Sequence, residues 1–288
     1  MVIKMTQHNA DKKLIPIREL SELTQVNTVT IRAWERRYGL LVPQRTPKGH
    51  RLYSEEDVTK VLDILAFIAK GVPVGKVKAL LTSKSSSSPK PSTHDWQQII
   101  EQLENTLSNG SLTQIKQSVQ DLALNYPIAL LRTEILQPLI HSLDDSNKIA
   151  ELMMLQSTLV DYALMRLNAK KAKKSKQTAL LICTERSPMW KLALAAIELN
   201  DANISVLLIN QPCDLSTWLS LTIKYEELEC IVFQDGVWRE REHEQIQQAL
   251  QNNSNLAFCG TAASVANIDL MRRITNTEQI LAYLTEKQ

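Results

Sequence analysis

The spacing of apolar positions changes twice along the chain. In residues 14–81 and again in 94–170, apolar side chains recur every three or four positions, as in helices with one buried face. From residue 177 onward, short continuous apolar runs alternate with helical segments. The pattern predicts a multi-domain protein: a small, mainly α domain, then an α-helical bundle, then a C-terminal α/β domain.

The predicted C-terminal domain spans residues 177–288. Its expected strands are the apolar runs at 178–183, 204–209, 230–233 and 256–259. The segments between them are long enough for crossover helices, which predicts a Rossmann-like parallel sheet. In residues 94–170, breaks at 108–110, 126–127 and 143–147 separate four predicted helices, for which a four-helix bundle is the economical arrangement.

The polar segments between these regions predict connectors. Residues 82–93 are rich in Ser and Pro and lack apolar side chains, so we expect a flexible linker. Residues 1–13 are expected to be a loose polar leader. The lysine-rich run at 170–176 is expected to be a solvated connector, with a secondary DNA contact as the alternative.

A basic helix is predicted from residue 28 to residue 38. Asn27 or Thr28 can cap its start, and Gly39 ends it. One face carries Ile31, Trp34 and Tyr38, and other faces carry Thr28, Arg32, Arg36 and Arg37. The preceding segment predicts a second short helix, with Pro16 in its first turn and an apolar face of Ile15, Leu20 and Leu23. Together they predict a helix-turn-helix.

A basic hairpin is predicted directly after this helix. Its turn is expected at Pro47–Gly49, where Gly49 would adopt the positive φ that other residues resist. Four cationic or titratable side chains surround the turn, namely Arg45, Lys48, His50 and Arg51. Cations at a hairpin tip suit phosphate oxygens, and neutralised phosphates release counterions. The hairpin is therefore a candidate DNA-binding wing.

The charge distribution favours the same interpretation. Residues 1–84 hold 15 Lys and Arg against 8 Asp and Glu, and the remainder holds 18 against 23, so the two parts carry net charges of +7 and −5. A basic part attracts nucleic acid, and an acidic part has a different task. Lys76 and Lys78, in a later short helix, are either a second phosphate contact or an ordinary solvated face.

Other function classes find little support. The four cysteines lack the paired spacings of structural zinc sites, so we expect free thiols, with Cys183, Cys230 and Cys259 as buried strand residues. The five histidines lie in separate segments, and no phosphate-cradling loop or catalytic motif is present. No membrane span or signal peptide is predicted. We expect a cytoplasmic protein that is not an enzyme.

The stretch from residue 30 to residue 58 resembles the DNA-binding domain of the MerR family of bacterial transcription regulators. The resemblance rests on the Arg-x-Trp-Glu-Arg core at 32–36, the Gly-Leu-Leu-x-Pro exit at 39–43, the wing at 45–53 and the acidic helix start after it. Arg32-Ala33-Trp34-Glu35 is similar to the MlrA-like subgroup, whose C-terminal domain is of the cobalamin-binding type. The order of helical bundle and Rossmann-like domain fits that subgroup.

The resemblance implies a homodimer that binds and distorts promoter DNA, so that RNA polymerase can engage it. It further implies activation, with biofilm or curli-type genes as targets. Trp34 is as consistent with a core position as with a DNA contact. The predicted DNA-binding residues are Thr28, Thr30, Arg32, Trp34, Arg36, Arg37, Arg45, Lys48, Gly49, His50, Arg51 and Tyr53.

We predict no cofactor. Cobalamin domains of this type carry Asp-x-His-x-x-Gly after the first strand, whereas residues 184–190 contain neither His nor Gly. The alternative is a ligand- or cobalamin-sensing regulator, with an unidentified protein or small molecule as effector. The candidate crevice for such a ligand lies at the carboxyl ends of the strands, at Glu185, Arg186, Asp235, Gly260 and Thr261.

Overall fold

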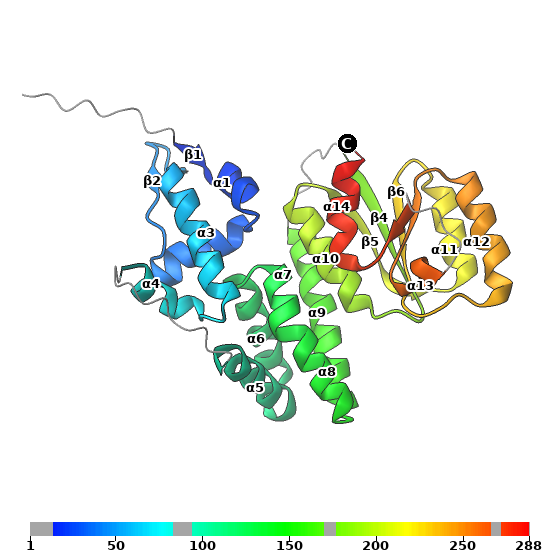
Figure 1. The fold of residues 1–288 in the computed structure, drawn as a ribbon, viewed down its shortest axis with the longest axis horizontal. Helices are drawn as coiled ribbons and strands as arrows, with labels where there is room; N and C mark the ends of the chain where they lie inside the picture. Colours follow the sequence, from blue (N-terminus) through cyan, green and yellow to red (C-terminus); the bar gives the residue numbers. More distant parts are fainter. Residues whose placement is uncertain (1–13, 83–93, 170–176, 266–271, 288) are drawn as a thin grey trace, which may run out of the picture. The chain divides into compact units, whose positions relative to one another are not determined.

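The computed structural model describes residues 14–82, 94–169, 177–265 and 272–287 (Figure 1). Its contacts divide the chain into two units, residues 1–105 with 120–139 and residues 106–119 with 140–288. The unit boundary falls within the predicted bundle, so the domain limits 14–81, 94–170 and 177–288 remain predictions. The leader at 1–13, the connector at 170–176 and all of the linker except Thr82 lie outside the described residues.

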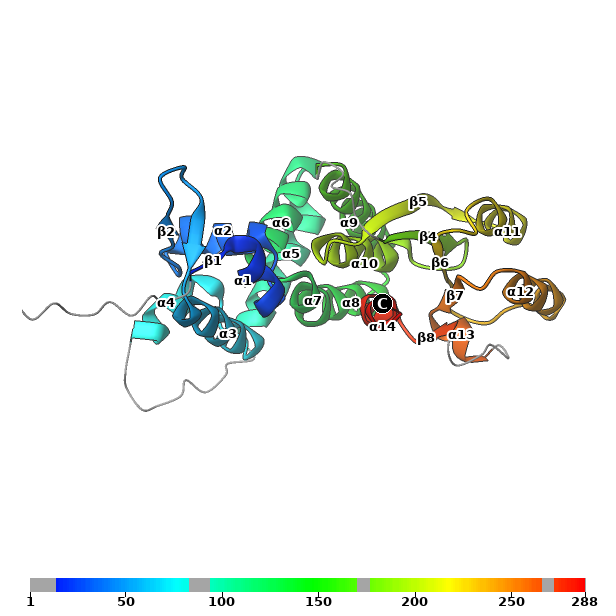
Figure 2. The same cartoon turned by 90° about the horizontal axis from the view of Figure 1, so that it is seen from above.

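The first unit begins with a helix-turn-helix and a hairpin, as predicted. Its helices are α1 (Ile17–Thr24), α2 (Thr28–Ala33), which continues as a π-helical segment (Trp34–Tyr38), α3 (Glu55–Ala69) and α4 (Val74–Thr82). Its strands are β1 (Ile15–Pro16), β2 (Gln44–Arg45) and β3 (Arg51–Tyr53), which form an antiparallel sheet in the order β1-β3-β2. Figure 2 shows the β2–β3 connection extending from this domain.

Two details of the first helix were predicted wrongly. Pro16 belongs to β1, where it lies opposite Leu52, and the helix begins at Ile17. Proline has no backbone N–H, so it suits an edge strand or a cap. Leu23 is 57% exposed, because Ile15 lies in the strand and the helix buries Leu20 and Thr24 instead.

The four helical segments predicted between residues 94 and 169 are present. They are α5 (His94–Asn109), α6 (Leu112–Asn125), α7 (Ile128–Leu130), which continues through a π-helical segment (Leu131–Leu136) into α8 (Gln137–Asp145), and α9 (Ile149–Ala169). The breaks fall where Gly110, Pro127 and the polar stretch at 143–147 predicted them.

The second unit contains the predicted parallel sheet. Its strands are β4 (Thr178–Thr184), β5 (Ser205–Cys213), β6 (Glu229–Phe233), β7 (Leu256–Cys259) and β8 (Arg273–Ile274), in the order β5-β4-β6-β7-β8. Its helices are α10 (Met189–Asp201), α11 (Leu215–Lys224), α12 (Glu240–Asn252), α13 (Thr261–Val265) and α14 (Ile280–Glu286). All four predicted strands are confirmed, whereas β8 and α14 were not predicted.

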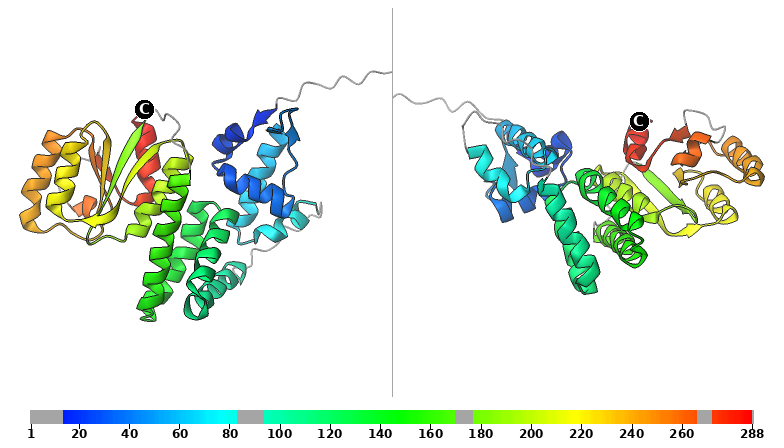
Figure 3. Two further views of the ribbon diagram at one scale, coloured as in Figure 1. Left: turned by 180° about the vertical axis from the view of Figure 1, so that it is seen from behind. Right: turned by 60° about the horizontal axis from the view of Figure 1, so that its bottom comes forward.

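Each face of the sheet is covered by its own apolar core. Leu192 of α10 and Ile280 of α14 pack on one face, and Trp218 of α11 and Ile246 of α12 pack on the other (Figure 2). Figure 3 shows α9 alongside α10, where Arg166 pairs with Asp201 at 3.2 Å. The strand order reverses around β4, which places a ligand crevice of the doubly wound type at the carboxyl ends of β4, β5 and β6.

In the described parts of the chain, no helix has the length and apolar character needed to span a membrane.

Candidate DNA-binding surface

The basic helix is fixed at both ends by its own residues. The Asn27 side chain accepts a hydrogen bond from the Val29 backbone N–H at 2.8 Å, and Gly39 ends the helix with a φ of +59°. Ile31 and Trp34 are fully buried, while Arg32 and Arg36 are exposed. The helix therefore presents guanidinium groups on the face opposite its core contacts.

The wing is a closed hairpin with its cations at the tip. Arg45 lies opposite Arg51, and within the loop the Gly49 N–H donates to the Thr46 carbonyl at 2.8 Å. Gly49 has a φ of +82°, as its predicted role in the turn requires. Lys48 and His50 on either side of it are exposed. These side chains are free to approach phosphates.

Glu35 joins the helix to the wing, a role that the sequence did not predict. Its carboxylate accepts hydrogen bonds from Arg45 at 3.1 Å and from Arg51 at 2.5 Å, and its side chain is only 15% exposed. The hydrogen bond that Arg51 donates to Glu35 raises the pKa of Arg51, against the opposing effect of burial. Because charge-assisted bonds are strong when partly shielded from water, Glu35 orients both strands of the wing. In the sequence, only its place in the Arg-x-Trp-Glu-Arg motif could have indicated this role.

Three predicted contact residues lie in the core instead. Thr30 is 2% exposed, and Trp34 and Tyr53 are fully buried, so their side chains have no surface to offer DNA in this arrangement. The Trp34 indole N–H donates to the Asn125 carbonyl at 2.9 Å. Burial raises the pKa of Tyr53 to about 12. We correct the predicted set by assigning these three residues to packing.

The remaining predicted residues reach the surface and include the six basic side chains, and together they are called the basic surface here. Thr28 and Arg51 are partly buried, and the exposed members are Arg32, Arg36, Arg37, Arg45, Lys48, Gly49 and His50. Arg37 differs from the others because it pairs with Asp121 of α6 at 3.0 Å. Its guanidinium therefore already forms an ion pair with a carboxylate of the first unit, which would compete with DNA phosphates.

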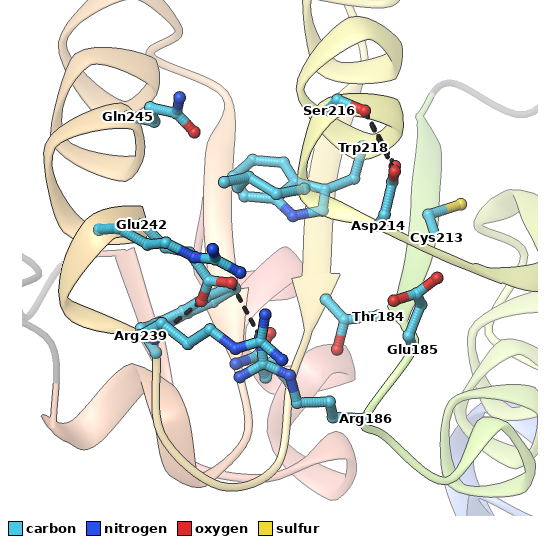
Figure 4. A pocket seen from close by; sticks show the side chains of 14 residues that line it. Thr184, Glu185, Arg186, Cys213, Asp214, Ser216, Trp218, Arg239, Glu242 and Gln245 are labelled. Atoms are coloured by element: carbon cyan, nitrogen blue, oxygen red, sulfur yellow. Dashed lines mark hydrogen bonds and ion pairs between the residues drawn. The ribbon is translucent and has the colours of Figure 1, made fainter.

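The ligand crevice predicted in the C-terminal half is divided in the structure. Asp235, Gly236 and Thr261 bond to one another, and the Asp235 carboxylate also pairs with Lys191 at 2.9 Å. Glu185 and Arg186 instead line a pocket of about 500 Å³ on the side of α11 and α12 (Figure 4). The predicted lining residues therefore do not form one site.

The loop after β4 does not fit cobalamin. Its two hydroxyl side chains are committed to the protein, since the Thr184 and Ser187 hydroxyls lie 2.9 Å apart and Ser187 accepts from the Asp235 N–H. No imidazole stands in this loop to ligate cobalt.

Across the described ranges, no group of His, Cys, Asp and Glu side chains could hold a metal. All four cysteines are free and buried, and burial raises the pKa of the Cys183 thiol to about 12.

Comparison with known proteins places these features in a family. Residues 15–84 match the model of the MerR HTH family regulatory protein. The HTH-type transcriptional regulator MlrA of Salmonella typhimurium is 34% identical over 170 residues, which cover 58% of this chain and 68% of that protein. The MlrA of Escherichia coli is 32% identical over the same length and with the same coverage.

Two further matches have lower coverage or lower identity. The HTH-type transcriptional repressor CarH of Myxococcus xanthus is 43% identical over 61 residues, 21% of this chain and 20% of that protein. The structure of the Methanosarcina barkeri monomethylamine corrinoid protein superposes with a TM-score of 0.48 and 12% identity, covering 67% of this chain and 99% of that one. The MlrA matches, which extend well beyond the helix-turn-helix, decide the assignment: this chain belongs to the MerR family of HTH-type transcriptional regulators.

Proposed function

We propose that the chain is a promoter-binding regulator that reads DNA with the basic surface of α2, its π-helical extension and the wing. The observation that carries this proposal is that Glu35 of the helix forms ion pairs with Arg45 and Arg51 of the hairpin. These ion pairs fix the orientation of the hairpin cations relative to those of the helix. Arg32 and Arg36 would enter the major groove, and Lys48 and His50 would contact the flanking backbone. No catalytic step is part of this function.

The proposal includes a homodimer that places two copies of this helix in successive major grooves of a pseudo-palindrome. Bending or twisting of the promoter would contribute to site choice and would let RNA polymerase engage it, which makes activation the expected outcome. The proposal extends to control of biofilm or curli-type genes, in the cytoplasm, as the sequence resemblance implies. Dimer contacts would come from outside the helix-turn-helix, because the sequence that follows it at 82–93 is rich in Ser and Pro and has no apolar residue.

Binding-site selection with the full chain, followed by titration of the selected duplex at stated salt, tests this proposal. Arg32→Ala and Arg45→Ala should each weaken binding by about tenfold, close to 1.4 kcal/mol. Arg18→Ala is the matched control, because its side chain is 63% exposed and pairs only within α1, with Glu22. Wild-type affinity in both test variants would contradict the contact assignment.

A second candidate function is a ligand-sensing regulator. The pocket beside α11 and α12 favours it, because its position at the reversal of strand order is where doubly wound sheets bind ligands. This function would add a small-molecule effector to the same DNA-binding surface.

A further inference from the structure

The pocket of about 500 Å³ lies at the carboxyl ends of β4, β5 and β6 (Figure 4). Its volume falls within the range of roughly 300–1,000 Å³ that is typical of small-molecule sites. One wall is the start of α12, and the opposite wall is formed by the end of β4 and the start of α11. The site is thus built by elements of a single unit.

The two walls carry opposite charges. On the α12 wall, Arg239 and Arg241 are exposed, and neither guanidinium forms an ion pair with a carboxylate among the residues that the structure describes. On the opposite wall stand the carboxylates of Glu185 and Asp214. Figure 4 shows Arg239 on one side and Glu185 and Asp214 on the other.

The remaining charges are already satisfied within the protein. Arg186 reaches across to Glu242 at 2.8 Å and also donates to the Val237 carbonyl at 3.2 Å. The Glu242 carboxylate, only 9% exposed, also accepts from the Arg239 backbone N–H at 2.8 Å. This bridge holds the two walls together and leaves the Arg239 and Arg241 side chains for a ligand.

Two tryptophan side chains form an aromatic part of the pocket lining. Trp218 and Trp238 both line it, with ring centroids 6.1 Å apart. Trp238 is 6% exposed, and its buried indole N–H has no hydrogen-bond partner among the described residues. The two indole rings therefore give the pocket an apolar lining beside its charged side chains.

We propose that this pocket binds an amino-bearing organic phosphate of mononucleotide size. Arg239 and Arg241 would hold the phosphate, because planar guanidinium groups bind phosphate oxygens in pairs. Glu185, helped by Asp214, would accept hydrogen bonds from the amino group across the pocket. Hydrogen bonds from the Thr217 side chain and from its backbone N–H, the latter at 2.8 Å, lower the pKa of the Asp214 carboxyl.

Calorimetric titration of the full chain with AMP, CMP, GMP, UMP and inorganic phosphate tests this proposal without involving DNA. At least one of the three nucleotides with an exocyclic amino group should bind saturably at one site per chain. UMP and inorganic phosphate should bind at least tenfold more weakly. Arg239→Gln and Arg241→Gln should each weaken binding at least tenfold, and Glu185→Gln should remove the preference over UMP.

Lys224→Gln is the control, since Lys224 is an exposed cation of the same unit that lies outside the pocket, over the ring of Tyr225. It should leave binding unchanged. Thermal unfolding of each variant, whose substituted side chain is exposed, should stay close to wild type. Failure of AMP, CMP and GMP to saturate at millimolar concentration would overturn the proposal. Unaltered affinity in both arginine variants, or inorganic phosphate binding as tightly as the nucleotides, would overturn it equally.

Discussion

In the proposed function, some residues of the basic surface would contact DNA and others would position those contacts. Glu35 belongs to the second kind, because its partly buried carboxylate bonds both Arg45 and Arg51. Its negative charge by itself would repel DNA phosphates. Its expected contribution to binding is therefore to orient the two arginine side chains. Sequence periodicity placed Glu35 on the helix correctly, but only the three-dimensional fold brings residues 45 and 51 to it.

Glu35→Gln should weaken binding to the selected duplex by about tenfold, since the neutral amide holds the two guanidinium groups less firmly. Titration at fixed salt measures the change. Glu22→Gln removes an exposed carboxylate from the ion pair with Arg18 and should alter affinity and stability by less than about 0.5 kcal/mol. Tighter binding by Glu35→Gln would mean that repulsion outweighs orientation, contrary to this account.

Tyr53 offers a test of the corrected site. Its hydroxyl is buried without a hydrogen-bond partner among the described residues, and burial raises its pKa to about 12. Tyr53→Phe should therefore change the free energy of unfolding by no more than about 1 kcal/mol, and towards greater stability. DNA affinity should stay at the wild-type value, whereas a DNA contact through this hydroxyl would make it fall.

The pH dependence of stability provides a second readout for Tyr53. The folded-state pKa is raised from 10.0 to about 12, so the unfolded chain ionises first. The stability held at pH 10 is then lost progressively as pH rises towards 12. Comparing denaturant unfolding of Tyr53→Phe with wild type should show a shallower decline in the variant, and identical slopes would refute the assignment of the shifted pKa.

At the scale of elements, periodicity predicted most of the fold. The basic helix, the wing, the helices between residues 94 and 169, and the strands β4 to β7 carry long or repeated patterns. The misses have physical reasons. β1 and β8 are two residues long, too short to show alternation, and the burial of Thr24 in place of Leu23 depends on partners distant in sequence.

The candidate sites were less predictable than the elements. Exposed cations of α2 and the wing could be named from spacing, but burial of Thr30, Trp34 and Tyr53 depends on tertiary packing. The residues of the ligand crevice were predicted only from their position at the carboxyl ends of the strands. The structure shows that Asp235 faces Lys191 rather than Glu185, which no local pattern reveals.

The contact between α6 and the basic helix leads to a prediction at the same scale. Asp121→Asn should release Arg37 from its ion pair and raise DNA affinity about two- to fivefold, since pairs this exposed contribute up to about 1 kcal/mol. Glu101→Gln, an exposed carboxylate of α5, is the matched control. An unchanged affinity in Asp121→Asn would show that Arg37 plays no part in DNA binding.

For the whole molecule, the division of charge along the sequence parallels a division of tasks. The basic N-terminal residues carry the DNA-binding surface, and the acidic remainder carries a sheet with a pocket of mixed charge. Membership of the MerR family accounts for the first task. The ligand proposed for the pocket can be tested independently of DNA binding.

The most direct test of the central claim is the salt dependence of binding between the full chain and its selected duplex. The logarithm of the association constant should fall linearly with the logarithm of salt concentration, with a slope near −0.9 for each phosphate neutralised. Lys48→Gln and Arg36→Gln should each make that slope shallower by about one. An affinity that does not respond to salt, or slopes unchanged in both variants, would contradict the claim that this helix and wing grip duplex DNA.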